Sequence, residues 1–147
     1  MAGAPTPRSM FISAEIHQFL ESDHPLAGAA RADLERFILG KRIVVALYRD
    51  HKDCLMARLD SPSDGVWELR ILDSDPQLRI FGQFAARDVF VALVGPIEHE
   101  YVVTDEEFEE YKKDCRDNWV DLFGFAYFPV RRSDDVDDYI SKPVRLI

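Results

Sequence analysis

The stretch that decides the fold reads Trp67-Glu-Leu-Arg-Ile-Leu-Asp-Ser-Asp-Pro-Gln-Leu-Arg-Ile-Phe-Gly-Gln-Phe84, and Asp88-Val-Phe-Val-Ala-Leu-Val-Gly95 follows almost at once. Apolar and polar residues alternate through much of it, which is the pattern of strands with one face buried. Two short turns divide the whole into three strands. Because strands this close in sequence leave no room for crossover connections, we predict an antiparallel meander.

The alternation also assigns side chains to faces of the meander. Glu68 and Arg70 of the first strand point to the polar face of the sheet. Arg79 of the second strand points to the same face. The segment 89–94 is apolar on both faces, so we predict a central strand that is covered on both sides. The predicted apolar face consists of Trp67, Leu69, Ile71, Leu78, Ile80 and Phe84.

Two helices are predicted ahead of the meander. Ser13 can cap a short helix over residues 14–21, which His24-Pro25 would end because proline restricts the residue before it. A second helix is predicted from about 26 to 39, where Gly40 supplies the stop. We expect the two to form a helical hairpin that packs on the sheet.

The segment 41–60 leaves two alternatives open. Ile43-Val-Val-Ala-Leu-Tyr48 has the composition of a strand, and Leu55-Met-Ala-Arg-Leu59 can form a strand that enters the meander. A helical interpretation also remains open for both, because the first is continuous with Gly40-Lys-Arg. Strands are the prediction that we carry forward.

A third helix is predicted after the meander. Thr104-Asp-Glu-Glu107 has the pattern of a capping box, and apolar residues keep helical spacing to about Phe123, before Gly124. The predicted fold class is therefore α+β: a helical hairpin packed on a 4-5-stranded antiparallel β-meander, followed by a C-terminal helix. The predicted organisation is a flexible lead-in over 1–10, one domain over 11–130 and an acidic tail over 131–147.

Charge and cysteine usage restrict the classes of function. The 147 residues carry 18 basic and 27 acidic side chains, a net charge of −9, so nucleic-acid binding would need a local basic patch. Cys54 and Cys115 are too few for a disulfide framework and show no CxxC motif, which favours free thiols. Without an apolar leader or spanning segment, we expect a soluble, cytoplasmic protein that does not bind membranes. The histidine spacing predicts no metal site, and nothing indicates a cofactor.

Three segments resemble the RelE/HigB (phage-derived toxin) superfamily: Gly65-Val-Trp-Glu-Leu-Arg70, Gln77-Leu-Arg-Ile-Phe81 and Val89-Phe-Val-Ala-Leu93. The resemblance covers roughly residues 11–95. It implies a small microbial ribonuclease, of a kind that mostly cuts messenger RNA on the ribosome and is neutralised by an antitoxin protein. It also implies that the strand arginines, here Arg70 and Arg79, face the RNA.

One departure from the family pattern bears on the site. The basic segment that usually follows the last strand is replaced by Pro96-Ile-Glu-His-Glu100, which leaves His99 for proton transfer. Cleavage through the 2′-hydroxyl needs a base, an acid and cations. We therefore predict Arg70 and Arg79 as charge stabilisers, with His99 or Glu68 handling protons.

Two alternatives accompany this hypothesis. Glu68, Arg70 and Arg79 could instead form cross-strand ion pairs on a solvated sheet face. The protein would then be a non-catalytic protein-interaction module of phage or mobile-element origin that uses the same fold. The aromatic group Phe123, Phe125, Tyr127 and Phe128 is predicted to complete the core, with a partner surface as its alternative.

Overall fold

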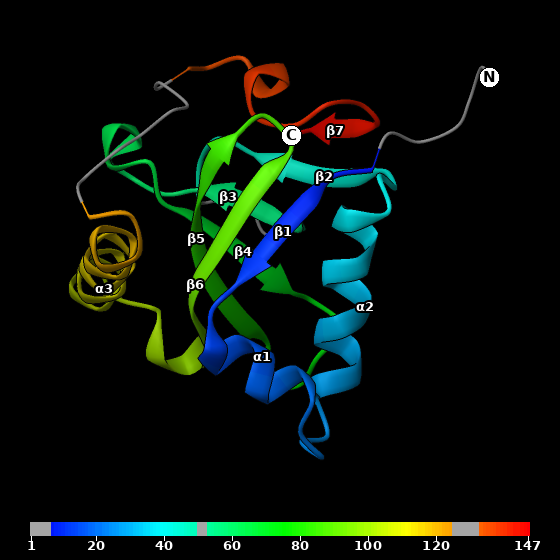
Figure 1. Cartoon of the computed structure of the whole chain (residues 1–147), viewed down its shortest axis with the longest axis vertical. Helices are drawn as coiled ribbons and strands as arrows, with labels where there is room; N and C mark the ends of the chain where they lie inside the picture. Colours follow the sequence, from blue (N-terminus) through cyan, green and yellow to red (C-terminus); the bar gives the residue numbers. More distant parts are fainter. Residues whose placement is uncertain (1–6, 50–52, 125–132) are drawn as a thin grey trace.

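A seven-stranded mixed sheet, curved into a half-barrel, forms the centre of the molecule (Figure 1). The structure is a computed structural model that describes residues 7–49, 53–124 and 133–147. The strands, in the sheet order β1-β6-β5-β4-β3-β2-β7, are β1 (Ser9–Ile12), β6 (Val89–Glu98), β5 (Leu78–Ala86), β4 (Trp67–Ile71), β3 (Met56–Arg58), β2 (Ile43–Ala46) and β7 (Val144–Leu146).

Three α-helices and three short 3-10 helices join these strands. The α-helices are α1 (Ala14–Leu20), α2 (Ala27–Ile38) and α3 (Asp105–Phe123). The 3-10 helices are η1 (Pro62–Asp64), η2 (His99–Tyr101) and η3 (Val136–Asp138). No helix in the described part of the chain is long and apolar enough to cross a membrane.

The predicted fold class is wrong in its sheet and in its helical hairpin. The antiparallel meander exists as β3-β4-β5-β6, but β1 pairs in parallel with β6, and β2 pairs in parallel with both β3 and β7. β1 and β6, like β2 and β7, are separated by long stretches of chain, and such connections permit parallel strands, whereas only residues 47–55 join β2 to β3. Moreover, α1 packs against β6 whereas α2 packs on β1 and β4, so the two helices cover different parts of the sheet.

Both edge strands come from segments that the sequence assigned elsewhere. β1 begins at Ser9, inside the predicted lead-in, and β7 lies inside the predicted tail. The buried Arg8 joins these ends of the chain, because its guanidinium donates to the carbonyl oxygens of Phe37, Lys41, Ser141 and Pro143 at 3.0–3.2 Å. Residues 1–6, the aromatic positions 125–128 and Arg131-Arg132 lie outside the described residues.

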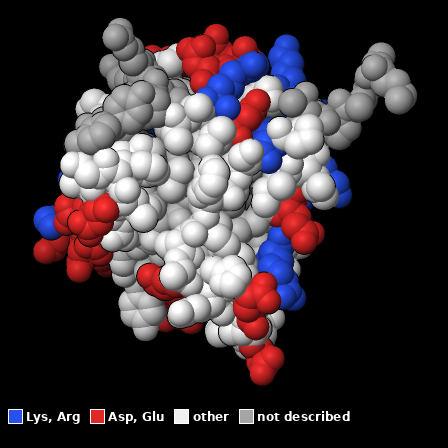
Figure 2. All heavy atoms as spheres, in the orientation of Figure 1, with Lys and Arg blue, Asp and Glu red and all other residues white. Residues whose placement is uncertain are grey.

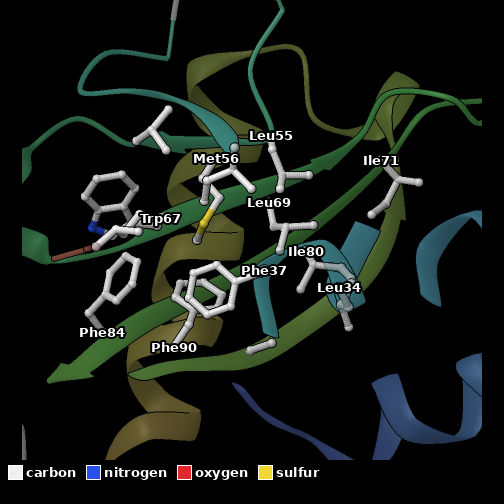
Figure 3. Packing of buried hydrophobic residues seen from close by; sticks show 14 of the residues in the cluster. Leu34, Phe37, Leu55, Met56, Trp67, Leu69, Ile71, Ile80, Phe84 and Phe90 are labelled. Atoms are coloured by element: carbon white, nitrogen blue, oxygen red, sulfur yellow. The ribbon is translucent and has the colours of Figure 1, made fainter. Parts of the chain in front are cut away.

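Apolar clusters cover both faces of the sheet. The larger one fills the space beneath α1 and α2, where Phe84 and Phe90 pack against Phe37 and Trp67 packs against Phe84 (Figure 3). A second cluster, beneath α3, contains Phe81, Val91, Cys115 and Trp119. α3 thus covers the face that carries the polar residues of β4 and β5, and that face is not solvated.

The start and end of α3 follow the sequence prediction. The Thr104 hydroxyl accepts the backbone N–H of Glu107 at 3.2 Å, and the Glu107 carboxylate accepts that of Val103 at 3.1 Å. These bonds satisfy donors that a helix otherwise leaves open. Gly124 ends the helix with φ 76°, a left-handed conformation that glycine adopts without strain.

Gly82 marks the closest approach between β5 and β6. A Cβ built there would lie 2.2 Å from the Val91 carbonyl oxygen and 2.6 Å from Phe90 Cζ. Because neither the strand nor the buried ring has free space, Gly82→Ala should lower the free energy of unfolding by about 2–4 kcal/mol. Urea denaturation followed by tryptophan fluorescence measures the change.

The matched control is Gly28→Ala in α2, where a new Cβ meets no atom within 4 Å. Alanine favours a helix over glycine, so this variant should gain up to about 1 kcal/mol. Equal stabilities for the two variants would show that β5 and β6 are less closely packed at Gly82 than described.

Candidate functional site

Three charged side chains lie buried on the face of β4 and β5 that α3 partly covers. Glu68 is 1 % exposed, Arg70 5 % and Arg79 6 %. Arg70 and Arg79 lie directly opposite one another in the strand pairing. Like charges in such positions repel, so a carboxylate between them is required for the sheet to hold both.

Glu68 supplies that carboxylate. Its Oε1 lies 3.1 Å from Arg70 Nε and 2.5 Å from Arg79 Nε, so one carboxylate oxygen joins both guanidinium groups. The cross-strand ion pairs that the sequence offered as an alternative are therefore present, but on a buried face rather than a solvated one. In such surroundings each charge depends on its partners, because water cannot replace them.

Neighbouring groups fix the direction of each guanidinium. Arg70 donates to the Arg49 carbonyl oxygen at 2.6 Å and to Cys54 Sγ at 3.3 Å, while Arg79 donates to Gln77 Oε1 at 3.2 Å. Burial raises the pKa of the Cys54 thiol, which keeps it protonated beside Arg70. Both arginines are thus pre-oriented by the strand meander and by the segment after β2.

His99 completes the group from η2, directly after β6. Arg79 Nη2 lies 3.0 Å from His99 Nδ1, and since a guanidinium can only donate, Nδ1 accepts and the neutral ring carries its proton on Nε2. Burial, and then the charge of Arg79, lower the pKa of His99 from its usual 6.5. The residue as a whole is exposed, so its ring is only partly removed from water. It is therefore a neutral imidazole placed where solvent reaches it.

All four residues predicted as the site line one cleft of about 610 Å³. Its complete lining is Arg49, Asp53, Glu68, Arg70, Gln77, Arg79, His99, Val102, Val103 and Phe108. Sequence reasoning missed Arg49 and Phe108. The guanidinium of Arg49 lies 4.4 Å from the Phe108 ring and pairs with Asp105, contacts between segments far apart in the chain that no local pattern signals.

The cleft gathers arginine side chains within an acidic protein, and one of them, Arg49, pairs with Asp105. Three arginines and two carboxylates line it, and His99 adds no charge in its neutral form. Arg79 Nη1 is buried without a hydrogen-bond partner among the described residues. A buried donor without a partner costs free energy, and an anion in the cleft would offset that cost. Figure 2 shows acidic side chains gathered over α3.

Metal binding finds no support in the part of the chain that the structure describes, where no cluster of His, Cys, Asp and Glu side chains could hold an ion. Comparison of the chain with protein-family models, with curated proteins and with solved structures finds no match. The function therefore has to be inferred from the geometry of the cleft.

Replacing Glu68 tests its role between the arginines. Glu68→Gln keeps the shape but leaves two buried guanidiniums without their carboxylate, so the free energy of unfolding should fall by about 3 kcal/mol. Inorganic phosphate should restore more stability to this variant than to the wild type, because an anion can replace the lost charge. Thermal unfolding with and without phosphate measures both effects.

Asp117→Asn is the control, since Asp117 pairs with Lys113 on the exposed side of α3. Such surface pairs contribute little, so its unfolding should resemble that of the wild type. If Glu68→Gln unfolds at the same temperature as the wild type and phosphate does not stabilise it, the carboxylate does not hold the arginines.

Proposed function

We propose that this protein is a ribonuclease of the RelE/HigB kind, which cleaves RNA by attack of a 2′-hydroxyl on the adjacent phosphate. One observation carries the proposal: Arg70, Arg79, Glu68 and His99, which come from β4, β5 and η2, line one cleft in which a single carboxylate oxygen joins two guanidinium groups. The resemblance extends the proposal to messenger RNA on the ribosome and to an antitoxin partner. The cleft supports the phosphate chemistry.

Arg70 and Arg79 bind the scissile phosphate in this proposal. A guanidinium meets phosphate oxygens through two parallel N–H groups, and two guanidiniums stabilise the extra negative charge of the pentacoordinate transition state. Glu68 positions both arginines through its single bridging oxygen.

His99 acts as the base. The incoming phosphate takes over Arg79 Nη2 and thereby frees Nδ1, which accepts the proton of the 2′-hydroxyl. The new O–P bond forms as the bond to the 5′-oxygen breaks, and that oxygen takes a proton from water at the open mouth of the cleft. The products are a 2′,3′-cyclic phosphate and a 5′-hydroxyl.

A second candidate function has its own observation. Seven acidic side chains of α3 are exposed to solvent, and they give this helix a strongly negative outer face (Figure 2). A basic protein partner would bind such a face, as in the non-catalytic interaction module. The residues are Asp105, Glu106, Glu109, Glu110, Asp114, Asp117 and Asp121.

Cleavage of purified RNA separates the two functions. Arg79→Gln and Arg70→Gln should each lower kcat/KM by about 100-fold, because each removes a cation from the transition state. Arg36→Gln, an exposed position on α2, is the control and should cleave like the wild type. Gel analysis of the cleaved ends gives the rate and identifies the cyclic phosphate.

The interaction module would be the correct function if the folded wild-type protein leaves RNA intact and retains a stoichiometric protein partner in a pull-down. Equal loss of activity in Arg36→Gln would show that net charge, rather than the cleft, governs cleavage.

The pH profile tests the role of His99. A base works in its neutral form, so kcat/KM should rise with pH and become level as the imidazole loses its proton. Because burial lowers the pKa of His99, this rise should centre below 6.5. His99→Gln should cleave slowly and lack the acidic limb, and an unchanged profile in this variant would exclude His99 as the base.

A further inference from the structure

A second cleft, of about 430 Å³, adjoins the candidate site. Arg49 and Phe108 line both clefts, so the arginine stacked on the Phe108 ring forms a shared wall between them. The second cleft lies between the connection from β3 to β4 and the first turns of α3. The two clefts therefore lie side by side, with Arg49 and Phe108 between them.

The charge of the second cleft is opposite in sign. Asp60, Asp105 and Glu109 line it, against Arg49 and Lys112. Arg49 pairs with Asp105, so its charge is matched within the wall.

The Lys112 ammonium is buried and fully engaged. Its three donors reach Glu109 at 2.7 Å, Asp64 at 3.0 Å and the Asp60 carbonyl oxygen. It has no donor left for a phosphate.

Asp60 is the acceptor that remains. Its carboxylate is exposed and pairs with no cation among the described residues. Apolar side chains also line the cleft: Leu59 and Pro62 beside Asp60, and Phe108 from α3. A flat ring with N–H donors on its edge fits an apolar wall beside a carboxylate, whereas a second phosphate would be repelled.

We infer that the second cleft is a nucleobase subsite that selects bases with an exocyclic amino group over uracil. The exocyclic amino groups of cytosine, adenine and guanine can donate hydrogen bonds to a carboxylate. Asp and Glu side chains accept such a bond from cytosine N4. Uracil presents a carbonyl oxygen in place of the cytosine amino group, which the Asp60 carboxylate repels. This inference rests on the proposed function, because it places the base beside the phosphate that Arg70 and Arg79 hold.

Cytidine and uridine monophosphates are matched probes, because they have the same ring size and the same phosphate. The full chain, labelled with ¹⁵N, is titrated with each nucleotide, and backbone amide shifts report the dissociation constant and the place of binding. Cytidine monophosphate should bind roughly fivefold more tightly or better, as one additional hydrogen bond to a charged group predicts. Its shifts should include Asp60, Ser61 and Phe108.

Asp60→Asn tests the acceptor directly, since the amide can donate to uracil as well as accept from cytosine. The ratio of the dissociation constants of the two nucleotides should fall below about twofold, because Asn keeps the shape of Asp but loses its charge and gains a donor. Asp60 is preferred to Glu109 for this test, because Glu109 also holds the buried Lys112. Asp121→Asn, exposed near the end of α3, should keep the wild-type ratio.

Nucleotide binding and RNA cleavage are measured separately, so the subsite and the ribonuclease can fail independently. Equal binding of the two nucleotides, or shifts that bypass residues 59–62, would overturn the subsite whether or not RNA is cut. Selective binding that depends on Asp60, in a protein that cleaves no RNA, would keep the nucleobase subsite and reject the ribonuclease.

Discussion

The contact on which the rest of the structure depends is the Glu68 carboxylate between Arg70 and Arg79. The strand pairing places the two arginines opposite one another, and α3 helps to bury them. Without the carboxylate, this face of the sheet would hold two like charges away from water. With it, two guanidinium groups share one carboxylate, so these three side chains together carry one net positive charge in a protein of net charge −9.

The mixed sheet explains how such a cleft is closed at its back. Apolar clusters cover both faces, and Arg8 joins the edge segments at the two ends of the chain through four carbonyl oxygens. The meander alone would leave its polar face open to water. Because α3 crosses that face, the same charged residues acquire a wall, with Phe108 on one side and Arg49 stacked against it.

In the proposed function, the two neighbouring clefts would bind different parts of a nucleotide. Guanidinium groups line the first and favour a phosphate, whereas the second offers a carboxylate beside apolar carbon and favours a base edge. Arg49 and Phe108 stand between the two clefts. Because the acidic surface repels RNA at long range, the proposed recognition would depend on short-range contacts.

The sequence by itself determined the local features: the meander with its two faces, the capped third helix, and the placing of Glu68, Arg70 and Arg79 on one side of adjacent strands. Alternation and capping depend on neighbours within a few residues, so they can be recognised along the chain. Only the tertiary structure decided the parallel strands β1 and β7, the burial of the charged face, and the roles of Arg49 and Phe108. Those features arise from contacts between segments that are distant in the sequence. The residues Ser9–Ile12, for example, are exposed or half-buried, and they form a strand because β6 offers an edge with which to pair.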